Sequence, residues 1–143
     1  MYGVKTNNCA RLVTAKSEAI TDTSTWRTTT PLDQAQLAYL VPWGSHASGL
    51  FLTKALRAGV HIKSPNLAFT HQQRRYGRGT LIINVHNNDA GIHDVVRRLA
   101  TETGAEVVSV DDSWVSDGPN FGSGNVMVLQ APKVALLWDE PTN

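Results

Sequence analysis

The chain lacks most of the features that announce a function in a sequence. Cys9 is the only cysteine among 143 residues, which excludes an internal disulfide and a zinc site built on several cysteines. No apolar run approaches the roughly 20 residues that cross a bilayer, and the first ten residues carry no apolar stretch like that of a signal peptide. We therefore expect no membrane partner and, by default, a cytoplasmic location.

Charge is also scarce. Charged residues make up 17% of the chain, against about 25% in an average globular protein. The 13 basic and 12 acidic residues leave a net charge of +1, which gives no strong field for holding nucleic acid. We therefore expect no nucleic-acid partner. Apolar residues reach 41%, so the chain is expected to fold, and its length fits one domain.

The N-terminal quarter of the chain has little hydrophobic periodicity. Positions 21–30 (TDTSTWRTTT) contain six threonines, whose hydroxyls compete for backbone hydrogen bonds and disfavour a helix. We expect residues 1–36 to form an extended arm or linker. Residues 37–143 are then a single α/β domain, either complete or a fragment of a larger protein.

Strand and helix patterns alternate after residue 37. Apolar runs predict strands, and i, i+4 stripes with capping residues predict helices at 47–58 and between the polar cluster 87–89 and Gly104. The expected strands are at 37–41, 60–63, 67–71, 80–85, 106–110, 126–130 and 134–138. This order predicts a mixed or parallel sheet with two crossover helices, nearest to a ferredoxin-like βαββαβ unit with added C-terminal strands. The alternative is a fragment of a doubly wound α/β domain.

The expected last strand, 134–138, is apolar on both faces, yet only five residues follow it. Such a strand needs cover on both sides. We expect either a longer native protein or a partner subunit, and with one chain the simplest partner is a second copy. The sequence thus predicts a homodimer with Leu136 and Trp138 buried between subunits or under the N-terminal arm.

One candidate ligand site lies between the first strand and the first helix. Ser45, His46 and Ser48 stand where helix N-terminal amides bind anions in many α/β proteins. The phosphate-loop motif is incomplete, because Leu50 replaces its lysine. The alternative interpretation is an ordinary capped turn.

A second candidate site follows the strand at 106–110. Asp111, Asp112 and Asp117 are placed where carboxylates serve as metal ligands or acid–base groups at the carboxyl ends of strands. Asp is equally common in turns for local reasons. Both interpretations stay open at this point.

Histidine and arginine patterns argue against two other classes of site. The five histidines have no zinc-motif spacing, so we expect no metal and no cofactor. Segment 71–78 places three arginines around Tyr76, but the next strand lacks the alternating aromatics of an RNA-binding sheet. This basic segment is interpreted as a hairpin tip.

Several stretches of the chain have counterparts in one family. They are 37–45 (LAYLVPWGS), 79–85 (GTLIINV), 112–118 (DSWVSDG) with 121–123 (FGS), and 131–142 (APKVALLWDEPT). In these stretches the chain resembles large bacterial proteins of the zinc carboxypeptidase (carboxypeptidase A-like) family, in the region C-terminal to their peptidase domain. The resemblance extends over residues 37–143, about three-quarters of the chain.

The resemblance implies an accessory domain without peptidase activity. The family's zinc is held by an H-x-x-E pair and a distant histidine, and this chain has no such pair. No catalytic residue is therefore carried over. In the family, the stretch similar to 132–142 leads into a glutamine-amidotransferase-like region, which implies that the present chain corresponds to part of a longer protein.

Two functional hypotheses follow. The first is a non-catalytic α/β binding or protein-interaction module, related to that accessory region and acting on a small ligand or a protein partner. The alternative is a small hydrolase-like or metal-assisted enzyme with a site at the strand carboxyl ends, built from Ser45, His46, Asp111 and Asp112. The two differ in whether these four side chains meet.

Overall fold

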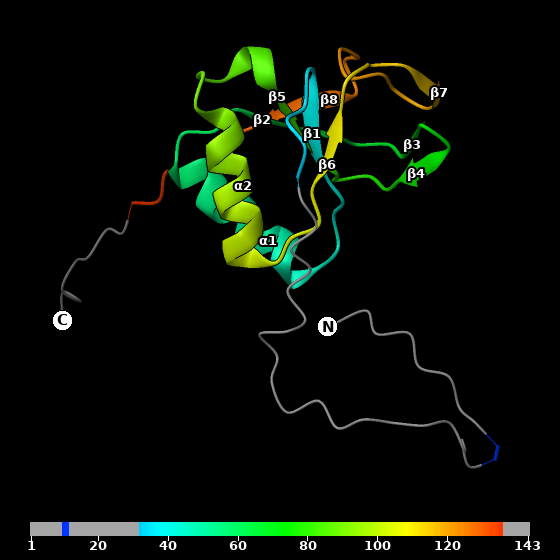
Figure 1. Cartoon of the computed structure of the whole chain (residues 1–143), viewed down its shortest axis with the longest axis horizontal. Coiled ribbons are helices and arrows are strands. Elements are labelled where there is room, and N and C mark those ends of the chain that lie inside the picture. Colours follow the sequence, from blue (N-terminus) through cyan, green and yellow to red (C-terminus); the bar gives the residue numbers. More distant parts are fainter. Residues whose placement is uncertain (1–9, 12–31, 136–143) are drawn as a thin grey trace, which may run out of the picture.

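Strands and helices alternate along residues 32–135, which with residues 10–11 are the part of the chain that this computed structural model describes. In chain order the elements are β1 (Ala38–Val41), α1 (His46–Arg57), β2 (Ile62–Pro65), β3 (Phe69–His71), β4 (Arg74–Tyr76), β5 (Leu81–Asn84), the 3-10 helix η2 (Val85–Asn87), α2 (Ile92–Thr103), β6 (Val108–Val110), β7 (Val115–Asp117) and β8 (Val126–Leu129). Figure 1 shows both helices on one side of the larger sheet and β3, β4 and β7 on the other.

The architecture is α+β with two antiparallel sheets. One has five strands in the order β6-β1-β5-β2-β8, and the other has three in the order β4-β3-β7. Every strand pair is antiparallel. The expectation of a mixed or parallel sheet is therefore wrong, and so is the alternative of a doubly wound fragment.

The crossover helices explain this error. Helix α1 connects β1 to β2, which run in the same direction, but β5 lies between them and is antiparallel to both. In the same way α2 connects β5 to β6 across β1. A crossover helix does imply two strands of one direction, but it does not make them neighbours.

The two helices differ in their N-cap residues. Helix α1 begins after Ser45, whose side chain accepts a hydrogen bond from the Ser48 amide in a capping box. Helix α2 begins after Gly91, without a side-chain cap. The N-cap expected from cluster 87–89 is therefore wrong, because Asn88 instead bonds the backbone of His61 on a neighbouring segment. Gly104 ends α2 in the left-handed conformation, as expected.

The larger core lies between the helices and the five-stranded sheet. The helix stripes supply Phe51, Ala55, Val96 and Leu99, and the sheet face supplies alternate residues of β1 and β5. The apolar stripes of the helices thus pack against the apolar face of the sheet, where every second residue of a strand points the same way. His93 on α2 is half-buried, and its Nδ1 lies 2.7 Å from the hydroxyl of Tyr39.

A second core fills the opposite face of the sheet. Leu40 and Ile82 point to this side and pack against Phe69, Tyr76 and Phe121. The basic segment 71–78 forms a hairpin here, because Gln72 and Gln73 have φ values of 47° and 62°, as a two-residue hairpin turn requires. The segment 111–125 also contains β7, in which Val115 pairs with His71 and Asp117 with Thr70 of β3 across a shift in register.

Residues near both ends of the described range 32–135 differ from the sequence expectation. Ala35, in the expected arm, is buried in the helix-side core, and its amide donates to the Tyr39 hydroxyl at 3.2 Å. At the other end, residues 131–135 are exposed and form no strand. The remainder of the strand expected at 134–138, with Leu136 and Trp138, lies outside the described residues. Within the described part of the chain, no helix is long and apolar enough to cross a membrane.

Candidate functional site

The hydroxyls of Ser45 and Ser48 are used to start α1. Ser45 Oγ accepts from the Ser48 amide at 3.0 Å, and Ser48 Oγ donates to the Ser45 carbonyl at 2.7 Å. Ser48 is also buried, at 1% exposure. His46, the first residue of the helix, is exposed. This geometry favours the capped turn over a ligand site at these residues, because the polar groups already bond one another.

Each predicted carboxylate also has a nearby protein partner. Asp111 Oδ1 accepts the Gln36 amide at 2.8 Å, and Asp117 accepts a guanidinium hydrogen bond from Arg75 at 3.3 Å. Asp112 Oδ1 accepts the Trp114 amide at 2.8 Å. That amide lowers the pKa of Asp112, and the Gln72 side chain lowers it further. Local turn and hairpin contacts therefore account for these carboxylates.

The two predicted groups lie at opposite ends of the sheet. Ser45 and His46 follow the last residue of β1, Val41, whereas Asp111 follows Val110, which pairs with the first residue of β1. The strand register therefore keeps Ser45 and His46 apart from Asp111 and Asp112. A composite hydrolytic or metal site needs them together, so this geometry does not support the enzymatic alternative. Among residues 10–11 and 32–135, no three His, Cys, Asp or Glu residues are placed to hold a metal ion.

His71 is the buried polar side chain of the second core. It is 1% exposed, and its ring stacks on Phe121 with 5.8 Å between centroids. Nε2 lies 3.0 Å from the carbonyl oxygen of Asp112, which can only accept, so Nε2 carries a proton. Nδ1 is buried without a partner in the described chain. The ring joins β3 to the segment that follows β6.

Strand β8 provides a different surface, at the edge of the five-stranded sheet. Among the residues that the structure describes, it pairs only with β2, so its other side is open. Met127 and Val128 are each 60% exposed. Val128 pairs with Lys63 on the helix-free face, and Met127, its neighbour, points to the helix side. The edge therefore exposes one large apolar side chain on each face.

Within residues 10–11 and 32–135, the edge strand β8 and the chain around it carry no charged residue. The whole of segment 118–132 lacks Asp, Glu, Lys and Arg, and β8 itself contains no proline. Natural sheet edges usually carry such residues, because an open edge exposes unpaired N–H and C=O groups that can pair with another strand. We call residues 126–129 with this open side the β8 edge.

The sequence identified β8 as a strand but not as an edge. Its residues VMVL resemble the apolar run of β1, which is completely buried. A continuous apolar run is typical of a strand covered on both faces. Only the neighbours of the strand distinguish the two cases, and no local signal in the sequence specifies them.

Comparison with known proteins found no matching family, no similar curated protein and no similar solved structure.

Proposed function

We propose that this chain is a non-catalytic α+β interaction module that pairs with a second copy of itself through the β8 edge. The observation that supports the proposal is an open, uncharged edge strand with Met127 and Val128 exposed on its two faces. Addition of a strand to such an edge is a recurring mode of protein recognition, in which main-chain hydrogen bonds provide affinity.

A second copy suits this edge for reasons of symmetry. An antiparallel pair of β8 strands is generated by a two-fold axis perpendicular to the sheet, and this places like faces together. The two Met127 side chains then lie together on the helix-bearing face of the joined sheet, and the two Val128 side chains lie on the opposite face. Because segment 118–132 is uncharged, no like charges oppose each other across the axis.

The pairing of two four-residue strands buries less than the roughly 1,200–2,000 Å² of a standard interface. We therefore expect a weak dimer from this contact alone, with a dissociation constant of about 10 to 100 μM. The homodimer expected from the sequence used Leu136 and Trp138, which lie outside the described residues. In the present proposal the contact is at β8.

The proposal also includes ancestry and fold class. The strand order β6-β1-β5-β2 with two helices on one face supports a ferredoxin-like unit, into which the β3–β4 hairpin is inserted and to which β7 and β8 are added. The resemblance of residues 37–143 to the accessory region of zinc carboxypeptidase-like proteins supports a module without peptidase activity.

The test is sedimentation equilibrium over a concentration range from about 5 μM to about 1 mM. We expect the average mass of the wild-type chain to rise from 15.6 kDa toward twice that value. Met127→Lys introduces a charge that the pairing would bring close to its copy, so this variant should remain monomeric. Leu67→Lys is the matched control, because Leu67 is 53% exposed but lies outside the β8 edge.

The proposal fails if the wild-type chain stays monomeric throughout this range. It also fails if the chain dimerises and Met127→Lys dimerises equally well, since the contact is then elsewhere. Loss of dimer in Leu67→Lys as well would indicate a general effect of added charge. Circular dichroism of each variant verifies that it is folded.

A further inference from the structure

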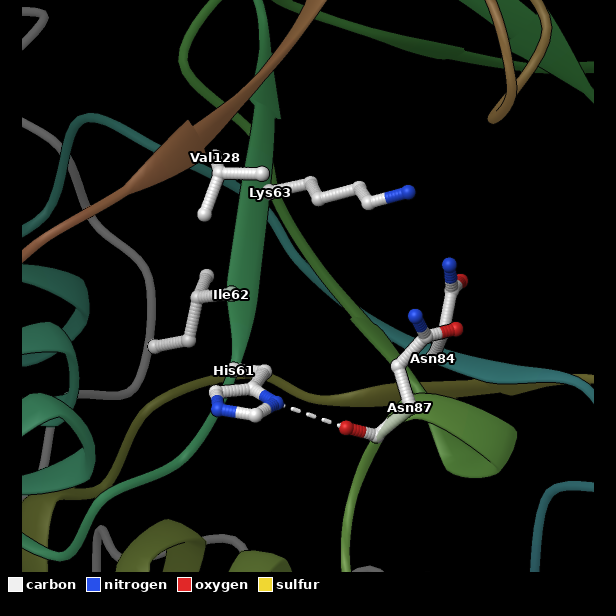
Figure 2. A pocket seen from close by; sticks show the side chains of 6 residues that line it. All are labelled: His61, Ile62, Lys63, Asn84, Asn87 and Val128. Carbon is white, nitrogen blue, oxygen red and sulfur yellow. Dashed lines mark hydrogen bonds between the residues drawn. The ribbon is translucent and has the colours of Figure 1, made fainter.

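A hollow of about 200 Å³ lies beside the β8 edge and was not predicted from the sequence. Figure 2 shows its lining: His61, Ile62, Lys63, Asn84, Asn87 and Val128. Lys63 pairs with Val128 on one side and with Ile82 on the other. Asn84 lies two residues after Ile82, so its side chain is on the same face. The hollow is therefore on the face of the five-stranded sheet opposite the helices.

Three polar side chains line this hollow without satisfying one another. Lys63 is half-buried and makes no ion pair with any residue that the structure describes. Asn84 and Asn87 bond other residues through their backbone oxygens, and their side-chain amides have no partner within the described chain. In Figure 2 the Lys63 side chain extends toward the side on which both asparagines lie.

The floor of the hollow is held in place by its own hydrogen bonds. The side chain of Asn88 accepts from the His61 amide at 2.7 Å and donates to the carbonyls of His61 and Asn84 at 3.2 and 2.8 Å. His61 Nδ1 lies 2.7 Å from the carbonyl oxygen of Asn87, so this nitrogen donates. These bonds fix η2 against the start of β2, and with it the positions of Asn84 and Asn87.

A second hollow, of about 180 Å³, adjoins the first. It shares Lys63, Asn84 and Asn87 with it and continues along the sheet face toward Leu37 and Phe121. The polar groups therefore lie where the two hollows meet, with apolar side chains on both sides. No Asp or Glu of the described part of the chain lines either hollow, so none of these carboxylates neutralises Lys63 there.

We propose that the Lys63 hollows bind a small monocarboxylate with an aliphatic body. The carboxylate accepts from Lys63 Nζ and from the side-chain amides of Asn84 and Asn87. The hydrocarbon part lies against Val128 in the first hollow, and a longer body extends toward Phe121 in the second. The proposal does not depend on dimerisation through β8.

The charge of the site selects a carboxylate over other ligands. One ammonium group balances one carboxylate, whereas a phosphate dianion is usually held by several cationic or backbone donors. A cationic ligand would be repelled by Lys63. An alcohol of the same shape keeps the apolar contact but loses the attraction to the ammonium. Comparing its affinity with that of the carboxylate therefore distinguishes the contribution of the charge from that of the hydrocarbon.

The test uses three probes with one hydrocarbon skeleton: isovalerate, isoamyl alcohol and isoamylamine. Each is titrated into the uniformly labelled chain, with inorganic phosphate as a fourth probe, and the amide and methyl shifts are followed by NMR. We expect saturable shifts with isovalerate at millimolar concentration, centred on the Asn84 and Asn87 side-chain amides and the Val128 methyls. The other three probes should bind at least about fivefold more weakly.

The matched variants are Lys63→Met and Lys133→Met. Both remove one positive charge, but Lys133 lines neither hollow. We expect Lys63→Met to weaken isovalerate binding at least about fivefold and Lys133→Met to leave it unchanged. The proposal is overturned if isovalerate produces no saturable shifts, if the alcohol or phosphate binds as well, or if Lys63→Met binds like the wild type. Because the wild-type shift map locates the ligand directly, the proposal remains testable even if a variant fails to fold.

Discussion

Gly118 is the glycine whose replacement tests the second core most directly. It follows β7 and has a φ of +90°, a conformation that favours glycine. A Cβ at this position would overlap the carbonyl oxygen of Ala68 and lie 2.8 Å from the Cα of Phe69. Both atoms belong to the backbone, so no side-chain rotation relieves the overlap. We expect Gly118→Ala to displace either β7 or the start of β3.

The size of the effect follows from two costs. A non-glycine residue at positive φ costs about 1 to 2 kcal/mol, and overpacking that moves the backbone costs about 1 to 3 kcal/mol more. Phe69 is fully buried and contacts Tyr76 and Phe121 with ring centroids 5.1 and 5.8 Å away, so its displacement disturbs the aromatic packing. The free energy of unfolding of the variant should be about 2 to 5 kcal/mol lower than that of the wild type, and its Tm should fall by at least about 8 °C.

Thermal and urea unfolding, followed by circular dichroism, measure this difference. Gly122→Ala is the control, because its nearest heavy atom to an added Cβ is 4.0 Å away and its φ is not positive. That variant should stay within about 0.5 kcal/mol of the wild type. Equal stability of the two variants would refute the close approach of Gly118 to β3. Near-ultraviolet circular dichroism should also lose aromatic signal in Gly118→Ala alone.

Two further predictions concern the helix side of the molecule. Tyr39→Phe removes the hydroxyl that accepts from the Ala35 amide and bonds His93. The free energy of unfolding, measured in urea, should fall by about 1 to 2 kcal/mol, and an unchanged urea midpoint would contradict this prediction. The Lys54 ammonium, 2.7 Å from Glu102, lowers the pKa of that carboxyl. Because the folded-state pKa is lowered, the carboxylate stabilises the folded chain above the unfolded pKa of about 4.3. This contribution is lost as the pH falls through the folded-state pKa. Any stability advantage over Glu102→Gln should therefore shrink on acidification, and a difference that grows below pH 4 would be incompatible with this ion pair.

Local chemistry was sufficient to predict several elements of this protein. The apolar run at 37–41 predicted a strand, and all four residues of β1 are buried. The helix expected at 47–58 is α1, which starts after the N-cap Ser45, because a serine hydroxyl satisfies a free amide at a helix N-terminus wherever the helix lies. Gly104 predicted the end of α2 for a similarly local reason, its access to the left-handed conformation. These features depend on neighbouring residues in the chain.

The sheet and the candidate sites were decided by tertiary structure. The runs of β1 and β8 are both apolar, but β1 lies between two strands and β8 has one neighbour. The sequence placed Ser45 and Asp111 at one end of a parallel sheet, and antiparallel pairing places them at opposite ends. Alternation could have indicated that His61 and Lys63 share a face, but the hollow beside them needs β5, η2 and β8 as well. Strand neighbours are chosen by contacts distant in sequence, so no local pattern specifies them.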